Sequence, residues 1–520
     1  MEQNQNKANR FQVWIYLTAI TALALRTIHY AGTSSMWYDE LTCALNVTEK
    51  SYYQLLTQPL DFNQVASIGF LLITKLSVSI FGEHDFAFRL WPWLCTVASV
   101  YFFYQIARVF LKDTALLAAF ILFAFSASGW FYAGQAKQYA GDIAASLFLV
   151  WATLQFYSHK INLSKTLLLS VGGFVFISAS MPAVALAGVL LCFLLIQFLF
   201  KTNQNSFRSY FIIGFTWALA CAWVTYHAKF VLDSGSVDAM SAYWSRGFVP
   251  LTGLSDALPW LIKKIRDELG YFVYFFLSEL WPVMTLFATI LLALAIAGII
   301  KLLATSKAKI FILLSPFFLA IALSLFRILP YDTRVALYAN WPLLIAAAYG
   351  VEWLSSISFR KIHPAIAKAF ILLIALPMPV IYLIEPNERP PFHCQPAQPV
   401  LKELKKRLQP GDIVYVYYKA RHAMKMYGHK EGITNYKLSG NYEKPAQYFQ
   451  QLDSLKGNKR VWFFFTHWTP KHKYPDSIQH YMANEIGKEI QVIKDPYGAS
   501  LEKECACTAT LYDLTQPVKK

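Results

Sequence analysis

The stretch AVALAGVLLCFLLIQFLF at positions 183–200 decides the class of fold, because Gln197 is its only residue with a strongly polar side chain. A helix needs about 20 mostly apolar residues to cross roughly 30 Å of hydrocarbon. Working outward along the chain, comparable runs cover 11–28, 90–111, 114–132, 139–157, 166–179, 210–232, 280–303, 310–326, 335–354 and 365–384. The sequence therefore predicts a polytopic α-helical membrane protein with about eleven transmembrane helices.

Two of these runs leave alternatives open. Run 166–179 is short, and three residues separate it from 183–200, so the two form either a tight hairpin or one broken unit. Run 11–28 follows Lys7 and Arg10 and ends without a clear small-residue cleavage site. We therefore interpret it as a retained first span rather than a cleaved signal peptide.

The composition excludes an ordinary soluble protein. Of 520 residues, 56% are hydrophobic and only 15% are charged, which lies outside the usual range of soluble domains. A formal net charge of +16 is compatible with nucleic-acid binding, yet most Lys and Arg stand in short clusters between the apolar runs, where they set topology. We therefore predict membrane lipids as the surroundings and no nucleic-acid partner.

The basic clusters predict the orientation of the chain. With the N-terminus in the cytoplasm, every second connection is basic: Lys112; His159, Lys160 and Lys165; Lys201 and Arg208; Lys301, Lys307 and Lys309; Arg360 and Lys361. This is the positive-inside pattern. An odd number of spans then leaves the C-terminal residues outside, so we expect a multi-pass protein of a bacterial inner membrane with a periplasmic C-terminus.

Two domains follow from this topology. Residues 1–384 form the transmembrane domain, whose outer loop 31–88 contains two stretches suited to helices lying in the interface, and residues 385–520 form a soluble C-terminal domain. That domain alternates helix-like 400–408 with strand-like 412–418 and 461–465, which predicts a small α/β fold.

The cysteines of the C-terminal domain permit one disulfide. If this domain is exported, Cys394 is able to pair with Cys505 or Cys507. The Cys505-Ala506-Cys507 spacing is too tight for a usual zinc site, so we predict no metal there.

The first candidate cluster is Trp37-Tyr38-Asp39-Glu40, just past the outer end of the first span. Carboxylates at that depth are costly unless they are used or paired. A carboxylate there is suited to general base catalysis, taking a proton from an acceptor hydroxyl that attacks a lipid-borne substrate. An equally open interpretation is a solvated helix cap.

The second cluster, 132–142, covers the outward turn between two predicted spans and contains Lys137, Tyr139 and Asp142. A lysine at this position either binds a phosphate or extends to the membrane interface. Spacing alone leaves both interpretations open.

The third cluster, 327–338, contains Arg327, Tyr331, Arg334 and Tyr338 on the outer side, where the positive-inside rule predicts few arginines. Guanidinium groups fit phosphate oxygens with paired hydrogen bonds, so a polyprenyl phosphate is a natural ligand. Pairing with Asp332 or with lipid headgroups is the structural alternative. Arg89, at the start of the second span, is another outward cation, which we interpret first as a helix anchor.

Taken together and in order, these clusters resemble membrane glycosyltransferases of the GT-C class, in particular bacterial protein mannosyltransferases and aminoarabinose transferases. The resemblance covers about residues 11–355 and rests on Asp39-Glu40, on 76–90, on 334–342, and on 132–142, which is similar to the family's Tyr-Ser-x-Glu-x-Lys-Gln-Tyr-Ser-x-Asp stretch. Two elements differ. The family's His-Pro-Pro or Lys-Pro-Pro element is replaced by 64–69, and its Glu by Gln135-Ala136.

The resemblance implies transfer of a sugar from a polyprenyl-phosphate donor to a lipid, glycan or protein acceptor on the outer face, by single inverting displacement. It favours Asp39 as general base with Glu40 beside it. Lys137, Arg327 and Arg334 become the candidate phosphate ligands, with Tyr331 and Tyr338 in support and Arg89, Tyr139 and Asp142 as further candidates. We predict no metal site, although a divalent cation assisting the carboxylates stays open.

Two other classes of function fit the same residues. A transporter or flippase of a lipid-linked anion would also use outward arginines, but transporters carry their polar residues and broken helices near the bilayer midplane, whereas here they gather at the outer interface. A non-catalytic scaffold of the same fold is the third possibility, suggested by the missing Pro-Pro element.

Overall fold

The computed structural model describes residues 2–33, 35–201, 205–274, 281–358, 369, 372–373, 375–384, 391–442, 444–466, 474–497 and 506–515. The chain forms two compact units. One comprises Met1–Ala31 with Lys50–Pro390, and the other Gly32–Glu49 with Pro391–Lys520. The sequence-based division had kept all of 31–88 with the membrane domain, whereas residues 32–49 fold with the C-terminal residues.

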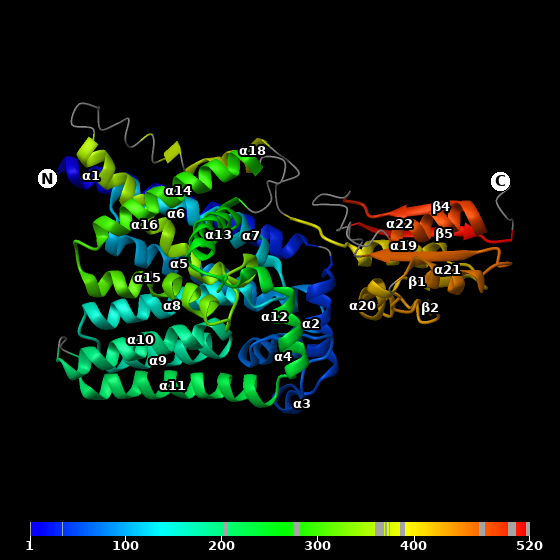
Figure 1. Ribbon diagram of the computed structural model, residues 1–520, viewed down its shortest axis with the longest axis horizontal. Coiled ribbons are helices and arrows are strands. Elements are labelled where there is room, and N and C mark those ends of the chain that lie inside the picture. Colours follow the sequence, from blue (N-terminus) through cyan, green and yellow to red (C-terminus); the bar gives the residue numbers. More distant parts are fainter. Residues whose placement is uncertain are drawn as a thin grey trace. The chain divides into compact units, whose positions relative to one another are not determined.

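The first unit is helical (Figure 1). Its N-terminal half contains α1 (Glu2–Gly32), α3 (Tyr52–Thr57), α4 (Ile68–Phe81), α5 (Asp85–Phe110), α6 (Asp113–Ala124), α7 (Ala127–Phe131), η1 (Tyr132–Gly134), α8 (Tyr139–Ser158), α9 (Leu163–Ser178) and α10 (Met181–Leu199). Its remaining elements are α11 (Phe207–Phe230), α12 (Ser234–Tyr243), η2 (Ser245–Gly247), α13 (Leu254–Tyr274), α14 (Trp281–Leu302), α15 (Lys307–Leu325), η3 (Thr333–Val335), α16 (Leu337–Ser358) and α18 (Pro377–Ile384).

Seven helices of the described chain are long and apolar enough to cross a membrane: Phe11–Gly32, α5, α8, α10, α11, α14 and α15. The pair α6 and α7–η1 becomes an eighth if a helix bent by 50° is counted as one span. The other expected spans differ for separate reasons. Helix α9 is only 16 residues long, α16 includes Asn340 and Glu352, and most of 365–375 lies outside the described residues.

Close backbone contact joins α14 and α16. A Cβ atom on Gly298 would stand 1.8 Å from the Ala346 carbonyl oxygen, and one on Gly350 would stand 2.0 Å from that of Leu294. Only glycine at both positions allows this approach. The packing fixes α16, whose N-terminal turn follows the third sequence cluster.

The second unit is the predicted α/β domain. Its sheet has the order β2-β1-β3-β5-β4, with β1 parallel to β2 and β3 and β5 antiparallel to β3 and β4. The strands are β1 (Ile413–Val416), β2 (Lys437–Leu438), β3 (Val461–Thr466), β4 (Lys488–Lys494) and β5 (Cys507–Asp513). The helices and turns are α2 (Tyr38–Glu49), α19 (Ala397–Arg407), η5 (Tyr418–Ala420), α20 (Arg421–Ala423), η6 (Met424–Gly428), α21 (Pro445–Asp453), α22 (Tyr474–Tyr481) and η7 (Met482–Ile486).

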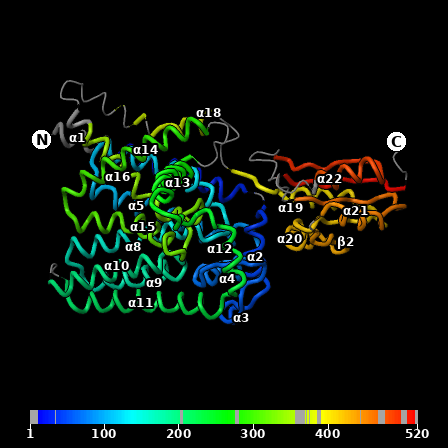
Figure 2. Tube along the Cα trace, viewed as in Figure 1, coloured from blue at the N-terminus to red at the C-terminus, as the bar shows by residue number. Residues whose placement is uncertain are grey.

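Helices α19, α21 and α22 accompany this sheet (Figure 2), and every residue of β3 is buried. An ion pair between Arg460 and Asp412, with Nε to Oδ1 at 2.6 Å, ties the start of β3 to the start of β1. Cys394 is disulfide-bonded and Cys507 is a free thiol, while Cys505 lies outside the described residues.

Candidate active site

The break between α6 and α7 leads into the segment that carries Tyr132, which forms one side of the candidate site. The Arg26 guanidinium, buried in α1, donates Nη2 hydrogen bonds to the carbonyl oxygens of Phe123 and Ala124, at 3.3 and 3.0 Å. These carbonyls end α6, and they also accept hydrogen bonds from the Ser126 hydroxyl and the Trp130 indole, so the arginine joins a network that closes the helix end. His29, one turn later in α1, lies 3.1 Å through Nε2 from the Phe131 carbonyl. Helix α1 thereby fixes the short segment that carries Tyr132.

The turn after Tyr132 holds the lysine of the second sequence cluster. Lys137 is only 5% exposed, and its Nζ donates a hydrogen bond to Oε1 of Gln64 at 2.6 Å. Gln64 belongs to the stretch that replaces the Pro-Pro element of the resembling family. This chain therefore supplies an amide oxygen to the lysine from that position.

Arg334 lies against two aromatic rings. Its guanidinium carbon stands 5.5 Å from the centre of the Tyr139 ring and 5.2 Å from that of Trp244, distances at which the ring faces attract a cation. Tyr139 also packs edge-on against Tyr132, with centroids 5.1 Å apart. The second and third sequence clusters therefore meet at Arg334 and Tyr139.

The segment that carries Arg334 is anchored to the η2 turn. The Tyr331 N–H donates to the Gly247 carbonyl at 2.8 Å, which also accepts a hydrogen bond from Ser324 Oγ at 2.8 Å. A Cβ on Gly247 would lie 2.7 Å from Cβ of Asp332, so a larger residue would separate the two segments. Trp244 and Arg334 are thus held in register by backbone contact.

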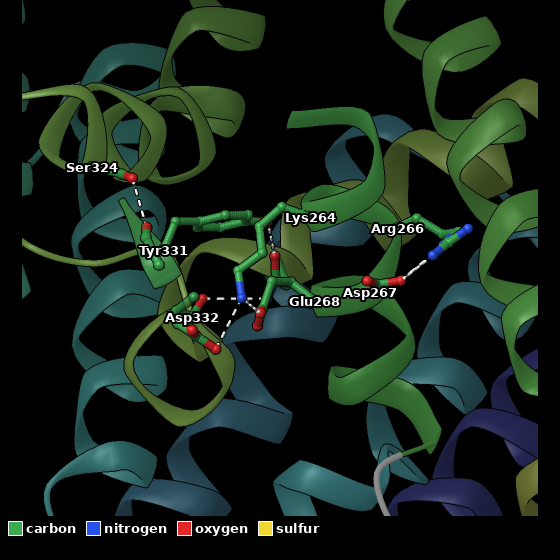
Figure 3. Close-up of polar contacts among 10 residues, drawn as sticks. Lys264, Arg266, Asp267, Glu268, Ser324, Tyr331 and Asp332 are labelled. Carbon is green, nitrogen blue, oxygen red and sulfur yellow. Dashed lines mark hydrogen bonds and ion pairs between the residues drawn. The ribbon is translucent and has the colours of Figure 1, made fainter. Parts of the chain in front are cut away.

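A charged cluster on α13 adjoins the same segment (Figure 3). Lys264 Nζ lies 2.9 Å from Oε1 of Glu268 and 2.9 Å from Oδ1 of Asp332. Glu268 is 2% exposed, and burial raises its pKa to about 7, although Lys264 and the Thr333 N–H favour the charged form. Burial lowers the pKa of Lys264, but the two carboxylates outweigh this and raise it above its ordinary value.

A pair of tyrosine side chains links α13 to the segment that carries Tyr132. The hydroxyl groups of Tyr132 and Tyr271 are 2.7 Å apart. Burial raises the pKa of the Tyr271 hydroxyl well above its ordinary value, and Tyr132 adds to the shift. Tyr271 therefore stays a neutral hydrogen-bonding group. Within the membrane unit, the segment from η1 to α8, the start of η2, α13 and η3 contribute to one aromatic and cationic site. We call it the Arg334 site (Tyr132, Lys137, Tyr139, Trp244, Tyr271 and Arg334).

Several buried polar atoms beside this site lack a hydrogen-bond partner among the described residues. They are Gln138 Oε1, Asp142 Oδ1 and the Tyr338 hydroxyl. The Ser146 hydroxyl of α8 donates to the Tyr338 carbonyl at 2.8 Å, which joins the helix that carries Asp142 to the start of α16. An unsatisfied buried polar group costs about 1–3 kcal/mol, so this arrangement favours a polar ligand.

Three other predicted residues have different surroundings. Arg327 is exposed, and its guanidinium lies over the Phe248 ring at 5.7 Å. The Tyr331 hydroxyl is fully buried and donates to Asn340 Oδ1 at 2.6 Å, so its contact is structural. Arg89 is fully buried in the first turns of α5.

Asp39 and Glu40 lie in the first turn of α2, in the second unit, where the helix dipole favours acidic side chains. Asp39 is half-buried. Glu40 is fully buried, and its Oε2 accepts a hydrogen bond from the Trp37 N–H at 3.2 Å. The described residues contain no group of three His, Cys, Asp or Glu side chains arranged as metal ligands.

Sequence reasoning missed Gln64, Trp244, Lys264, Glu268 and Tyr271. The signal for part of this set was present, because Lys264 and Glu268 are four residues apart and Tyr271 follows three residues later, which places all three on one helical face. No local pattern marks Gln64 or Trp244, because their contacts join segments far apart in the chain.

Solved membrane glycosyltransferases share this fold. The apo oligosaccharyltransferase of Archaeoglobus fulgidus superposes with a TM-score of 0.50 at 12% identity, covering 97% of this chain and 74% of that chain. Arabinofuranosyltransferase AftD from Mycobacteria has a TM-score of 0.50 at 14% identity, covering 98% of this chain and 40% of that chain. ArnT from Cupriavidus metallidurans, bound to undecaprenyl phosphate, has a TM-score of 0.46 at 11% identity, covering 97% of this chain and 99% of that chain.

No family model and no curated protein sequence matches the chain. The structural similarity nevertheless confirms the expected GT-C fold, and the chain has the predicted apolar helices and a small sheet in its C-terminal α/β unit. The chain is therefore a multi-pass membrane protein.

Proposed function

We propose that the protein is a membrane glycosyltransferase that moves a sugar from a polyprenyl-phosphate donor to a lipid, glycan or protein acceptor. The observation that carries this proposal is the Arg334 site. Arg334 lies against the rings of Tyr139 and Trp244, and the second cation, Lys137, precedes Tyr139 by two residues. Nearby buried polar atoms have no hydrogen-bond partner among the residues that the structure describes. Phosphate suits the cations, and a sugar suits the rings and the polar atoms.

The two cations have separate roles in this mechanism. The Arg334 guanidinium offers paired N–H donors to phosphate oxygens, while the rings of Tyr139 and Trp244 hold its plane. Lys137, oriented by Gln64, is a compact second charge. Both favour departure of the polyprenyl phosphate, because negative charge grows on its oxygens as the bond to the sugar breaks.

We assign the general base to Asp39, on the strength of its position in the motif that resembles GT-C enzymes. The acceptor oxygen attacks the anomeric carbon, the bond from that carbon to the phosphate oxygen breaks, and the acceptor proton passes to the Asp39 carboxylate. One such displacement inverts the anomeric configuration. Glu40, buried and bonded to the Trp37 N–H, keeps the start of α2 ordered. We further propose the periplasmic face of a bacterial inner membrane as the location.

The test replaces Asp39 by Asn in cells that otherwise lack the protein. Loss of the carboxylate should reduce transfer by about a hundredfold or more, measured by mass analysis of surface glycans and lipid A with and without the gene. Asp238→Asn is the matched control, because Asp238 is an exposed aspartate on α12. Protease accessibility checks that each variant is inserted. Wild-type glycans in cells with Asp39→Asn would exclude the base assignment, and identical glycans with and without the gene would exclude transferase activity on these acceptors.

A further inference from the structure

Two adjoining hollows open between α10, α14 and α15 of the membrane unit, with no residue in common with the Arg334 site. They have volumes of about 620 and 580 Å³. The first is lined by residues of all three helices, among them Ile299, Lys307 and Leu314, and the second by α10 and Phe311. Val189 and Phe311 line both. The hollows therefore meet along these two side chains.

The linings are almost entirely apolar. Apart from Lys307 and Ser315 in the first hollow and Cys192 in the second, every lining residue is a hydrocarbon side chain or glycine. The three helices are among those able to span a membrane, so the hollows face the hydrocarbon layer. Two adjoining apolar hollows that share the side chains of Val189 and Phe311 match a lipid with two acyl chains better than a lipid with one isoprenoid chain.

One end of the paired hollows is cationic. Lys307 lines the first hollow at the start of α15, and Lys301 and Lys309 stand on the same connection, whose residues 301–309 include no acidic side chain. The rings of Phe193 on α10 and Phe311 near the start of α15 stack with centroids 5.5 Å apart, so α10 contacts the N-terminal turns of α15. Among the described residues, the N-cap residue Ser306 makes no side-chain cap hydrogen bond, and the N-terminal end of α15 adds positive potential through the helix dipole.

We propose that these two hollows, which we call the α10–α15 groove, form a specific site for an anionic diacyl phospholipid. Its acyl chains occupy the two hollows on either side of Phe311. Its phosphate lies at Lys307 and the start of α15. The groove is separate from the proposed catalytic function, and its test requires no transfer assay.

Two glycines make a matched pair for this test. A Cβ atom on Gly188, which lines the second hollow, would meet no atom within 4 Å, and the same holds for Gly214 on α11. Gly188→Leu should therefore fill the hollow without disturbing packing, while Gly214→Leu adds the same side chain on α11, outside the residues that line the two hollows. Lys307→Ala removes the headgroup cation, and Lys160→Ala, in another basic connection, is its control.

The measurement is native mass spectrometry of the full chain after incubation with phosphatidylglycerol, phosphatidylcholine or undecaprenyl phosphate in detergent. Wild type should retain phosphatidylglycerol about fivefold better than phosphatidylcholine, since one lysine contributes about 1 kcal/mol to anionic lipid binding. Gly188→Leu should lose retention of both phospholipids. Lys307→Ala should lose only the preference for phosphatidylglycerol over phosphatidylcholine. The controls Gly214→Leu and Lys160→Ala should behave as wild type. Equal retention by Gly188→Leu and Gly214→Leu would overturn the proposal, as would displacement of phosphatidylglycerol by equimolar undecaprenyl phosphate.

A second measurement uses the unaltered protein. Cys192 is exposed and lines the second hollow, Cys221 is half-buried outside the lining, and Cys43, Cys95 and Cys507 are buried. Phosphatidylglycerol should slow maleimide labelling of Cys192 about fivefold more than phosphatidylcholine does. Equal labelling rates in the two lipids would contradict the proposed occupancy.

Discussion

At the scale of single residues, Arg334 is the most informative side chain, because it combines charge with a fixed plane. We expect Arg334→Ala to weaken donor binding by about tenfold to a hundredfold, since a hydrogen bond to a charged group contributes about 1.5–3 kcal/mol. Arg334→Lys should restore little, because an ammonium group neither forms paired bonds nor stacks on Tyr139 and Trp244. Apparent donor and acceptor affinities, measured separately in membranes, check this.

Arg327 is the control for that prediction, since it is exposed and lies over Phe248. Arg327→Ala should leave donor affinity within about twofold, as expected of an exposed side chain. A loss equal to that of Arg334→Ala would show that the effect follows net charge rather than the aromatic contacts.

Single residues also mark the limit of what the sequence predicted. Arg334 and Tyr139 were selected from the excess of polar groups at outward turns, and the structure brings them together. Trp244 and Gln64 were not selected. Their contacts, a cation–π contact with Arg334 and a hydrogen bond with Lys137, join segments far apart in the chain, so no regular spacing in the sequence marks them. Tyr331 was assigned to phosphate because its type fits, yet its bond to Asn340 depends on the fold.

At the scale of elements, α13 provides a pH-dependent contact with the segment that carries Arg334. Burial raises the pKa of Glu268 from 4.5 to about 7, so between these values the folded protein binds more protons than the unfolded chain. Stability should therefore fall as the pH rises from about 4.5 to about 7, by on the order of 1–3 kcal/mol, and level off above that. Thermal unfolding in detergent across this range measures the slope.

Glu268→Gln should flatten this slope, because the amide does not titrate. Asp267→Asn, on the same helix, should keep the wild-type slope, since Asp267 is half-exposed and pairs with Arg266 at 2.6 Å (Figure 3). If Glu268→Gln retains the slope, other groups produce the pH dependence.

The sequence predicts the strongly apolar helices of the chain well and the amphipathic ones poorly. The strongly apolar α10, α14 and α15 lie within a few residues of the predicted runs, because a long run without charges has few alternatives to a membrane helix. Helix α13 was left in a connection because its apolar face alternates with Lys264, Arg266, Asp267 and Glu268. An amphipathic helix has no continuous run of apolar residues that a search for membrane spans would detect.

At the scale of the whole molecule, residues from both ends of the chain complete the unit that contains the proposed base, and Tyr38 contacts Gln395 across 357 positions of sequence. The Met36 N–H donates to the Tyr427 hydroxyl at 2.7 Å, and the Tyr38 N–H to Gln395 Oε1 at 2.9 Å. The Tyr38 ring packs edge-on against His422 at 5.3 Å. Burial lowers the pKa of His422 to about 3, and Arg421 and Lys425 add to this, so the packed imidazole is neutral.

These contacts predict that the C-terminal residues hold α2 in its folded position. Tyr427→Phe removes one hydrogen bond, worth about 1 kcal/mol, so amide exchange in residues 36–49 should accelerate about fivefold. Tyr415→Phe is the control, because Tyr415 is equally buried and donates to Gln451 at 2.8 Å instead. Hydrogen–deuterium exchange with peptide mass analysis resolves the two regions. Equal acceleration at 36–49 in both variants would mean that the domain loosens as a whole, whereas a change confined to Tyr427→Phe identifies the hydroxyl as the local attachment of the helix that carries Asp39.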